Sequence, residues 1–257
     1  MAVQPGEIVV GRHAVAEALE NAPQRAQELL LAAPPRSAAM ARILELARSA
    51  GVKVRQISRV DLDRLAGGVV HQGLGLRLAA ADYASLEELV LAARAAGPRA
   101  LVLMADHIQD PHNLGAMARS AAAAGALGLV VAKDRSCPLT PAVAKAAAGA
   151  LERLPVCRVT NLTSALEEFK AAGLWSLAAA TRGAPPPWRL DLDLPLVLVV
   201  GGEHKGVGQR LLGTCDLTAS LPLAPGVESL NASVATGVLL FEIVRQRQMA
   251  GLVRDKA

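Results

Sequence analysis

The sequence predicts an α/β protein built from two domains. Stretches with strand character alternate with stretches of helical periodicity along almost the whole chain, which is typical of sheets covered by helices. Hydrophobic residues make up 52% of the 257 residues, enough for a substantial core, whereas aromatic residues make up 2%, so the core must be aliphatic. This length fits one large domain or two small ones.

The first 80 residues predict a small α/β domain. Strand and helix patterns alternate in it, with strands expected at 8–10, 28–33, 52–57 and 73–79 and helices at 12–22, 37–50 and 59–65. Residues 81–98 are interpreted as a linker that contains a connecting helix at 86–96. The basic side chains of this region fall mostly at element ends, which favours a solvated surface over an RNA-contacting patch.

Residues 99–257 predict a second, larger α/β domain. We expect strands at 99–105, 127–132, near Val156, at 174–180 and at 196–200, and helices at 114–124, 141–151, 163–172 and 231–249. The last helix is apolar early and basic late. Its Arg245 and Arg247 have a simple explanation, because cations near a helix C-terminus are stabilised by the helix dipole. Its Val238, Leu239, Ile243 and Val244 could face either the core or a second subunit.

Charge and cysteine content exclude several classes of protein. The net charge of +4 permits a nucleic-acid partner without requiring one. Three well-separated cysteines fit a reducing compartment and no disulfide framework, and no metal-ligand spacing is present. We find neither a signal peptide nor a run long enough to span a membrane, so we expect a cytoplasmic protein that does not enter membranes.

Two polar loops follow predicted strands of the second domain. In the first, Asp110-Pro111 favours a turn, Asn113 can cap the following helix, and Arg119 lies among alanines. An arginine there needs a partner, which could be an anion or RNA or a structural salt bridge. In the second, the glycines of Gly201–Gly208 match neither the dinucleotide fingerprint nor the Walker A motif, and Glu203 is either an exposed turn residue or a group that orients a ligand.

A third polar stretch, Leu221–Ala235, precedes the last helix. It turns at Pro225-Gly226 and then places Glu228, Ser229 and Asn231 close together. Asn231 or Ser229 would cap the helix, because either side chain can accept from its first free N–H groups. The stretch by itself is equally consistent with a simple capped helix and with a site for a polar ligand.

The three stretches together resemble a known family. The blocks Asp110–Arg119, Val199–Gly206 and Leu221–Ala235 are similar to the three signature motifs of the SpoU (TrmH-like) RNA 2′-O-ribose methyltransferases of the SPOUT superfamily. The N-terminal segment, with Val10-Gly-Arg-His-Ala-Val15 and His71-Gln-Gly73, looks like the L30e-like substrate-binding domain of the subgroup that methylates a guanosine of bacterial 23S rRNA.

The resemblance implies a fold, partners and a site. It implies an α/β methyltransferase domain with a deep trefoil knot, a homodimer, an RNA substrate and S-adenosyl-L-methionine as methyl donor, leaving S-adenosyl-L-homocysteine, with no metal. The positions that match the family's catalytic residues are Arg119, Asn113, Glu203, Ser229 and Asn231. The positions that match its cofactor-binding residues are Gly201, Gly202, Leu221, Gly226 and Leu230.

The implied chemistry is the transfer of a methyl group from a sulfonium to a ribose 2′-hydroxyl, which requires alignment of three atoms and removal of a proton. A guanidinium remains protonated and has no acceptor, so our hypothesis is that Arg119 holds an RNA phosphate and polarises the hydroxyl. Two departures from the family pattern, His204 and Ala232, leave the fine geometry open. Alternative functions are methylation of another rRNA or tRNA site, or a non-catalytic RNA-binding or ribosome assembly module.

Overall fold

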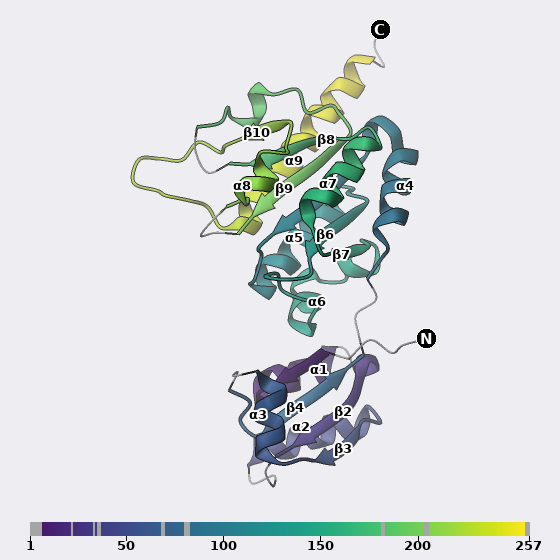
Figure 1. Cartoon of the computed structure of the whole chain (residues 1–257), viewed down its shortest axis with the longest axis vertical. Helices are drawn as coiled ribbons and strands as arrows, with labels where there is room; N and C mark the ends of the chain where they lie inside the picture. The colour runs from purple at the N-terminus through teal and green to yellow at the C-terminus, as the bar shows by residue number, and fades with distance from the viewer. Residues whose placement is uncertain are drawn as a thin grey trace. The chain divides into compact units, whose positions relative to one another are not determined.

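The computed structural model describes residues 7–21, 23–32, 34, 37–67, 70–79, 83–180, 183–202 and 206–254. The chain forms two compact units (Figure 1). One contains Met1–Asp82 with Thr140–Lys145, and the other contains Tyr83–Leu139 with Ala146–Ala257. Among the described residues, no helix combines the length and the apolar character that crossing a membrane requires.

The N-terminal unit has the predicted alternation of strands and helices. In chain order these are β1 (Glu7–Val10), α1 (Arg12–Asn21), β2 (Ala26–Leu31), α2 (Ala38–Ser49), β3 (Lys53–Gln56), α3 (Arg59–Ala66) and β4 (Leu74–Leu78). The sheet order is β1-β4-β2-β3, with β4 antiparallel to both of its neighbours and β2 parallel to β3. Ser37 and Ser58 cap α2 and α3 through their side chains, which explains where these helices begin.

The second unit is built on a parallel sheet of six strands in the order β10-β8-β9-β5-β6-β7. Its strands are β5 (Leu101–Asp106), β6 (Gly128–Ala132), β7 (Val156–Val159), β8 (Trp175–Ala179), β9 (Leu196–Gly201) and β10 (Leu217–Ala219). The helices of the chain from residue 83 onward are α4 (Leu86–Ala96), α5 (Pro111–Ala123), α6 (Pro141–Ala147), α7 (Leu162–Ala171), α8 (Gln209–Leu212) and α9 (Ala232–Arg254). The core is aliphatic as predicted, apart from the fully buried Phe169.

The order of the strands creates a crevice at one edge of this sheet. The chain passes from β5 to β6 in one direction across the sheet and from β9 to β10 in the other. Because such connections are right-handed, α5 and α8 leave the neighbouring strands β5 and β9 toward opposite faces. Ligands of open α/β sheets bind at this kind of switch point, beyond the carboxyl ends of the strands.

Several boundaries differ from the sequence predictions for physical reasons. The short elements α8 and β10 were not anticipated. The helix expected at 141–151 ends at Ala147, because Ala148 and Gly149 have φ values of +47° and +83° and the chain continues as a 3-10 turn. Asn113 does not cap α5, since Asp110 is the N-cap and accepts from the backbone N–H of His112.

The explanation of Arg247 by the helix dipole was wrong. The last helix continues to Arg254, and the side chain of Arg247 is only 6% exposed. Its guanidinium donates to the backbone oxygens of Arg99, Ala100 and Leu194 at 2.8, 2.9 and 2.6 Å. Arg247 therefore fastens α9 to the segments that lead into β5 and β9.

A second polar network joins strand β8 to the start of β10. The Asp216 carboxylate accepts from the backbone N–H and the hydroxyl of Ser176 at 2.9 and 2.6 Å and pairs with Lys170 at 2.7 Å. Burial raises the pKa of Asp216, but the hydrogen bonds from Lys170 and Ser176 outweigh it and lower the pKa overall. The ionised form of this carboxyl is therefore part of the native structure.

Candidate active site

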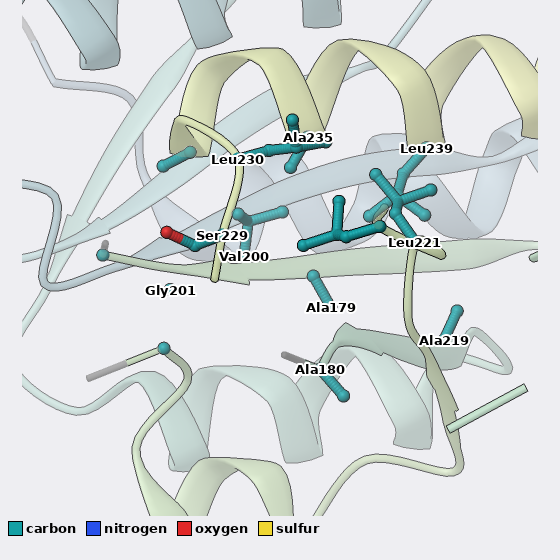
Figure 2. Close-up of a pocket in the computed structure, with 14 residues that line it drawn as sticks. Ala179, Ala180, Val200, Gly201, Ala219, Leu221, Ser229, Leu230, Ala235 and Leu239 are labelled. Atoms are coloured by element: carbon teal, nitrogen blue, oxygen red, sulfur yellow. The ribbon is translucent and has the colours of Figure 1, made fainter. Parts of the chain in front are cut away.

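A pocket lies at the carboxyl ends of β8 and β9, under the start of α9 (Figure 2). Its lining residues are Ala179, Ala180, Val200, Gly201, Gly202, Gly206, Ala219, Leu221, Leu223, Ser229, Leu230, Ala232, Ala235 and Leu239. None of these lining residues carries a charged side chain. As far as the described residues line it, the pocket is therefore an aliphatic slot whose polar groups are backbone amides and carbonyls and the Ser229 hydroxyl, an arrangement suited to a flat, largely uncharged ring system.

The last residue of β9, Gly201, and the next residue, Gly202, must be glycine because the chain packs against itself there. A Cβ on Gly201 would lie 1.9 Å from the carbonyl carbon of Gly206, and one on Gly202 would lie 2.7 Å from the carbonyl oxygen of His107. Backbone hydrogen bonds close the same turn, from Gly202 N to Asp106 O at 2.9 Å and from Gly206 N to Gly202 O at 2.8 Å. The floor of the pocket is thus bare backbone held in one position.

Asn231 joins the first polar loop to the third. Its Oδ1 accepts from the backbone N–H groups of Ser233 and Val234 at 2.9 and 3.2 Å, so Asn231 is the cap of α9. Of the two predicted caps, Asn231 and Ser229, the first is therefore confirmed. Its Nδ2 donates to Oδ1 of Asn113, which is 8% exposed, at 2.8 Å. The capping bonds fix which end of the amide faces Asn113, so this bond also holds the first turn of α5.

The predicted cofactor-binding positions mostly line the pocket. Gly201, Gly202, Leu221 and Leu230 do so, together with the predicted catalytic Ser229. Gly226 is not among the lining residues and instead occupies the turn, with a φ of +85° that favours glycine. The predicted Glu203 and its neighbour His204 lie outside the described residues.

Arg119 lies on α5, and its side chain is exposed. It follows Asn113 by six residues, which turns it about 120° around the helix from Asn113 and shifts it about 9 Å along the axis. Within the described part of the chain, we find no hydrogen bond or ion pair made by its side chain, which disfavours the structural salt bridge. Within a single chain, Arg119 therefore does not lie on the side of α5 that contacts Asn231.

Two residues at the end of β5 were missed as site candidates. Asp106 is 4% exposed; its Oδ1 accepts from Nδ1 of His107 at 2.6 Å, and its Oδ2 accepts from the backbone N–H of Gly208 at 2.8 Å. The sequence contained one signal that could have identified them, an aspartate directly after a predicted apolar strand. A carboxylate buried at such a position must be paired with a hydrogen-bond donor.

Comparison with known proteins agrees with this geometry. Residues 100–241 match the SpoU rRNA Methylase family, and residues 8–84 match the RNA 2′-O ribose methyltransferase substrate binding family. The 23S rRNA (guanosine-2′-O-)-methyltransferase RlmB of Xanthomonas axonopodis pv. citri is 42% identical over 93% of this chain and 96% of its own length. The RlmB protein of Pseudomonas putida is 41% identical over 95% of this chain and 98% of its own length.

Solved structures show the same fold. The SpoU methyltransferase AviRb of Streptomyces viridochromogenes, determined in complex with AdoMet, aligns with a TM-score of 0.59 at 24% identity, covering 95% of this chain and 91% of its own. The matches to a methylase family and to a substrate-binding family, each over one part of the chain, define the class of protein as an RNA 2′-O-ribose methyltransferase. The chain belongs to the SpoU rRNA methylase family.

Proposed function

We propose that this enzyme methylates the ribose 2′-hydroxyl of a guanosine in 23S rRNA, using S-adenosylmethionine, in the cytoplasm, where ribosomes are assembled. The observation that carries the proposal is the aliphatic pocket of Figure 2, because its walls are the second and third polar loops and Asn231 ties it to the first. The extent of similarity to RlmB proteins, over more than nine-tenths of both chains, supports the same substrate.

The residues of the pocket fit this cofactor. S-adenosylmethionine supplies a methyl group on a positively charged sulfur. The aliphatic walls suit an adenine ring, and the backbone at Gly201 and Leu221 offers the hydrogen-bonding groups that orient it. The volume of the pocket is about 90 Å³. Because ligand pockets usually measure roughly 300–1,000 Å³, we expect the exposed loop 221–230 to move outward when the whole cofactor binds.

The remaining predicted residues have separate roles in the proposal. Asn113 and Asn231 hold the mouth of the pocket, and the Ser229 hydroxyl and Glu203 orient the ribose. Arg119 binds an RNA phosphate and polarises the 2′-hydroxyl by donating to it. Replacement of Arg119 by alanine should abolish turnover and leave S-adenosylmethionine affinity nearly unchanged; retained turnover would refute this role.

Two further features of the proposal concern domains and assembly. In this proposal, residues 1–80 bind and present the RNA, residues 81–98 connect the two domains, and residues 99–257 catalyse methyl transfer. The trefoil knot remains an implication of the family.

On α9, Val234, Val238 and Phe241 form an apolar stripe and are 51%, 44% and 50% exposed. We propose that this stripe pairs with a second copy to form a homodimer. Val238→Asp should then sediment as a monomer, and a wild-type protein that is monomeric at micromolar concentration would contradict the pairing.

The function is tested by mapping ribose methylation. 23S rRNA from a strain lacking the gene should lack one 2′-O-methylguanosine, and the purified enzyme with S-adenosylmethionine should restore it. An unchanged methylation map would overturn the rRNA assignment, and failure of calorimetry to detect cofactor binding would favour a non-catalytic module.

A further inference from the structure

A second cleft opens at the same edge of the sheet, on the side of α7 and α8. It measures about 420 Å³ and lies where β5, β6, β7 and β9 end. Its lining includes His107, Asp134, Arg135, Asn161 and Arg210, and none of its described lining residues also lines the pocket of Figure 2. The turn after β9 separates the two cavities, because Gly202 and Gly206 line the first and Gly208 lines the second.

Two arginines of the cleft are available for an anion. Arg135 and Arg210 are both exposed, and within the described residues neither side chain makes a hydrogen bond or an ion pair. Lys133, also exposed, lies two residues before Arg135. Among the lining residues that the structure describes, Asp134 is the acidic side chain at the rim, since the other lining carboxylate, Asp106, is buried and already bonded. A guanidinium pair of this kind matches the oxygens of a phosphate.

His107 is held in the cleft by a strained backbone. Its φ is +57°, a left-handed conformation that costs free energy in a residue with a Cβ. Asp106 binds its Nδ1, so Nε2 is the ring nitrogen left for a ligand, and the side chain is 37% exposed. The same aspartate holds Gly208 N, which fixes the imidazole relative to the turn that borders the other pocket.

A polar amide completes the cleft. Asn161 lines the cleft and caps α7 by accepting from the backbone N–H groups of Thr163 and Ser164 at 2.9 and 3.3 Å, so its Oδ1 is used by the cap and its Nδ2 is not. The cleft therefore combines cations for a phosphate with a histidine and an amide for a sugar or base edge. RNA recognition uses this combination where bases are unpaired.

We propose that this cleft binds the nucleotide that adjoins the methylated one in a single-stranded RNA segment. Arg135 and Arg210 contact its phosphate, and His107 and Asn161 contact its nucleoside. The inference rests on the proposed function, since it needs the target ribose at the neighbouring pocket. It adds a subsite that determines which nucleotide of the bound RNA strand lies at the methyl donor.

The test measures the affinity of the full-length protein for a fluorescein-labelled 23S rRNA fragment, chosen as the shortest one that the wild type binds. The double variant R135A/R210A should bind this fragment at least tenfold more weakly at about 0.1 M salt. The slope of log K against log salt should fall by about 0.7, since the two arginines share one phosphate and each phosphate contact to a single strand contributes about 0.7. Its affinity for S-adenosylmethionine should stay within twofold of the wild type. The matched control is Arg94→Ala, which replaces an exposed arginine of α4 outside the cleft. It should change neither the RNA affinity nor the salt slope.

The variant His107→Gly separates the cleft from the stability of the fold. Glycine adopts the same φ without strain, which offsets part of the cost of leaving the buried Asp106 Oδ1 without its histidine partner. RNA affinity of the folded variant should fall several-fold with an unchanged salt slope. RNA affinities of both variants within twofold of the wild type would overturn the inference. A wild type that binds rRNA but never methylates it would contradict the proposed function instead, and the cleft would still be judged by RNA affinity.

Discussion

The hydrogen bond between Asn231 and Asn113 allows the cohesion of the candidate active site to be measured. Replacement of Asn231 by alanine removes the cap of α9 and the donor that faces Asn113 Oδ1. Loss of an N-cap costs about 1 kcal/mol, and loss of a side-chain hydrogen bond costs about 1 kcal/mol. We therefore expect the free energy of unfolding of the second unit to fall by about 2 kcal/mol.

Replacement of Asn231 by aspartate divides this loss into its two parts. A carboxylate still accepts from Ser233 N and Val234 N, and a negative charge is favourable at a helix N-terminus. It cannot donate to Asn113 Oδ1 and places two oxygens against each other. Asn231→Asp should therefore cost about 1 kcal/mol, the share of the hydrogen bond alone.

Tryptophan fluorescence in urea is the suitable assay, because Trp175 and Trp188 are the only tryptophans and both belong to the second unit. With an m-value of about 2 kcal/mol per molar, the midpoint should shift by about 1 M for the alanine variant and by about 0.5 M for the aspartate variant. Equal midpoints for the wild type and Asn231→Ala would refute the reasoning. Equal losses in both variants would show that the cap contributes nothing.

Three further predictions follow from the same structure. Gly201→Ala should weaken S-adenosylmethionine binding at least tenfold in calorimetry, because the added Cβ would meet Gly206 at 1.9 Å and force the pocket floor to move; unchanged affinity would show that the floor is not part of the site. Arg247→Met should lower the free energy of unfolding in urea by about 3 kcal/mol, since it leaves three inward-facing carbonyls without their donor; a loss below about 1 kcal/mol would mean that water replaces the guanidinium. Burial raises the pKa of Asp216, but hydrogen bonds from Lys170 and Ser176 outweigh it and lower the pKa in the folded state. The stabilisation by the ionised carboxylate is therefore complete above the unfolded pKa of about 3.9 and is lost as pH falls through the folded-state pKa. In urea titrations below about pH 4, Asp216→Asn should therefore lose less stability per pH unit than the wild type, and parallel curves would contradict this linkage.

The elements that the sequence predicted best are those with their own local signals. Helix α4 was expected at 86–96 and has these bounds, because Ser85 caps it and Gly97 ends it. Strands such as β5 and β9 are continuous apolar runs between polar loops, so their position follows from burial on both faces. By contrast, α8 and β10 have four and three residues, too few to display any periodicity.

The candidate site depends on contacts that local patterns do not contain. Asn113 and Asn231 are 118 residues apart, and only their positions in two family motifs suggested that they meet. The sequence prediction for Arg247 used only its position near the end of a helix. Its hydrogen-bond acceptors lie in the segments before β5 and β9, far away in the sequence, and no neighbouring residue indicates that its side chain is buried. The cap of α5 was misplaced for a local reason, since Asp110 before a proline is a stronger start than Asn113.

The glycines at the end of β9 show a constraint that no local motif reveals. The chain approaches itself there, at Gly206 and at the carbonyl of His107, so these positions have no room for a Cβ whatever the ligand is. Asp106 then fastens the same turn through Gly208 N while it orients His107. One buried carboxylate thus sets the position of the turn between the two cavities, so a change at Asp106 should disturb both together, whereas His107→Gly should affect only the second.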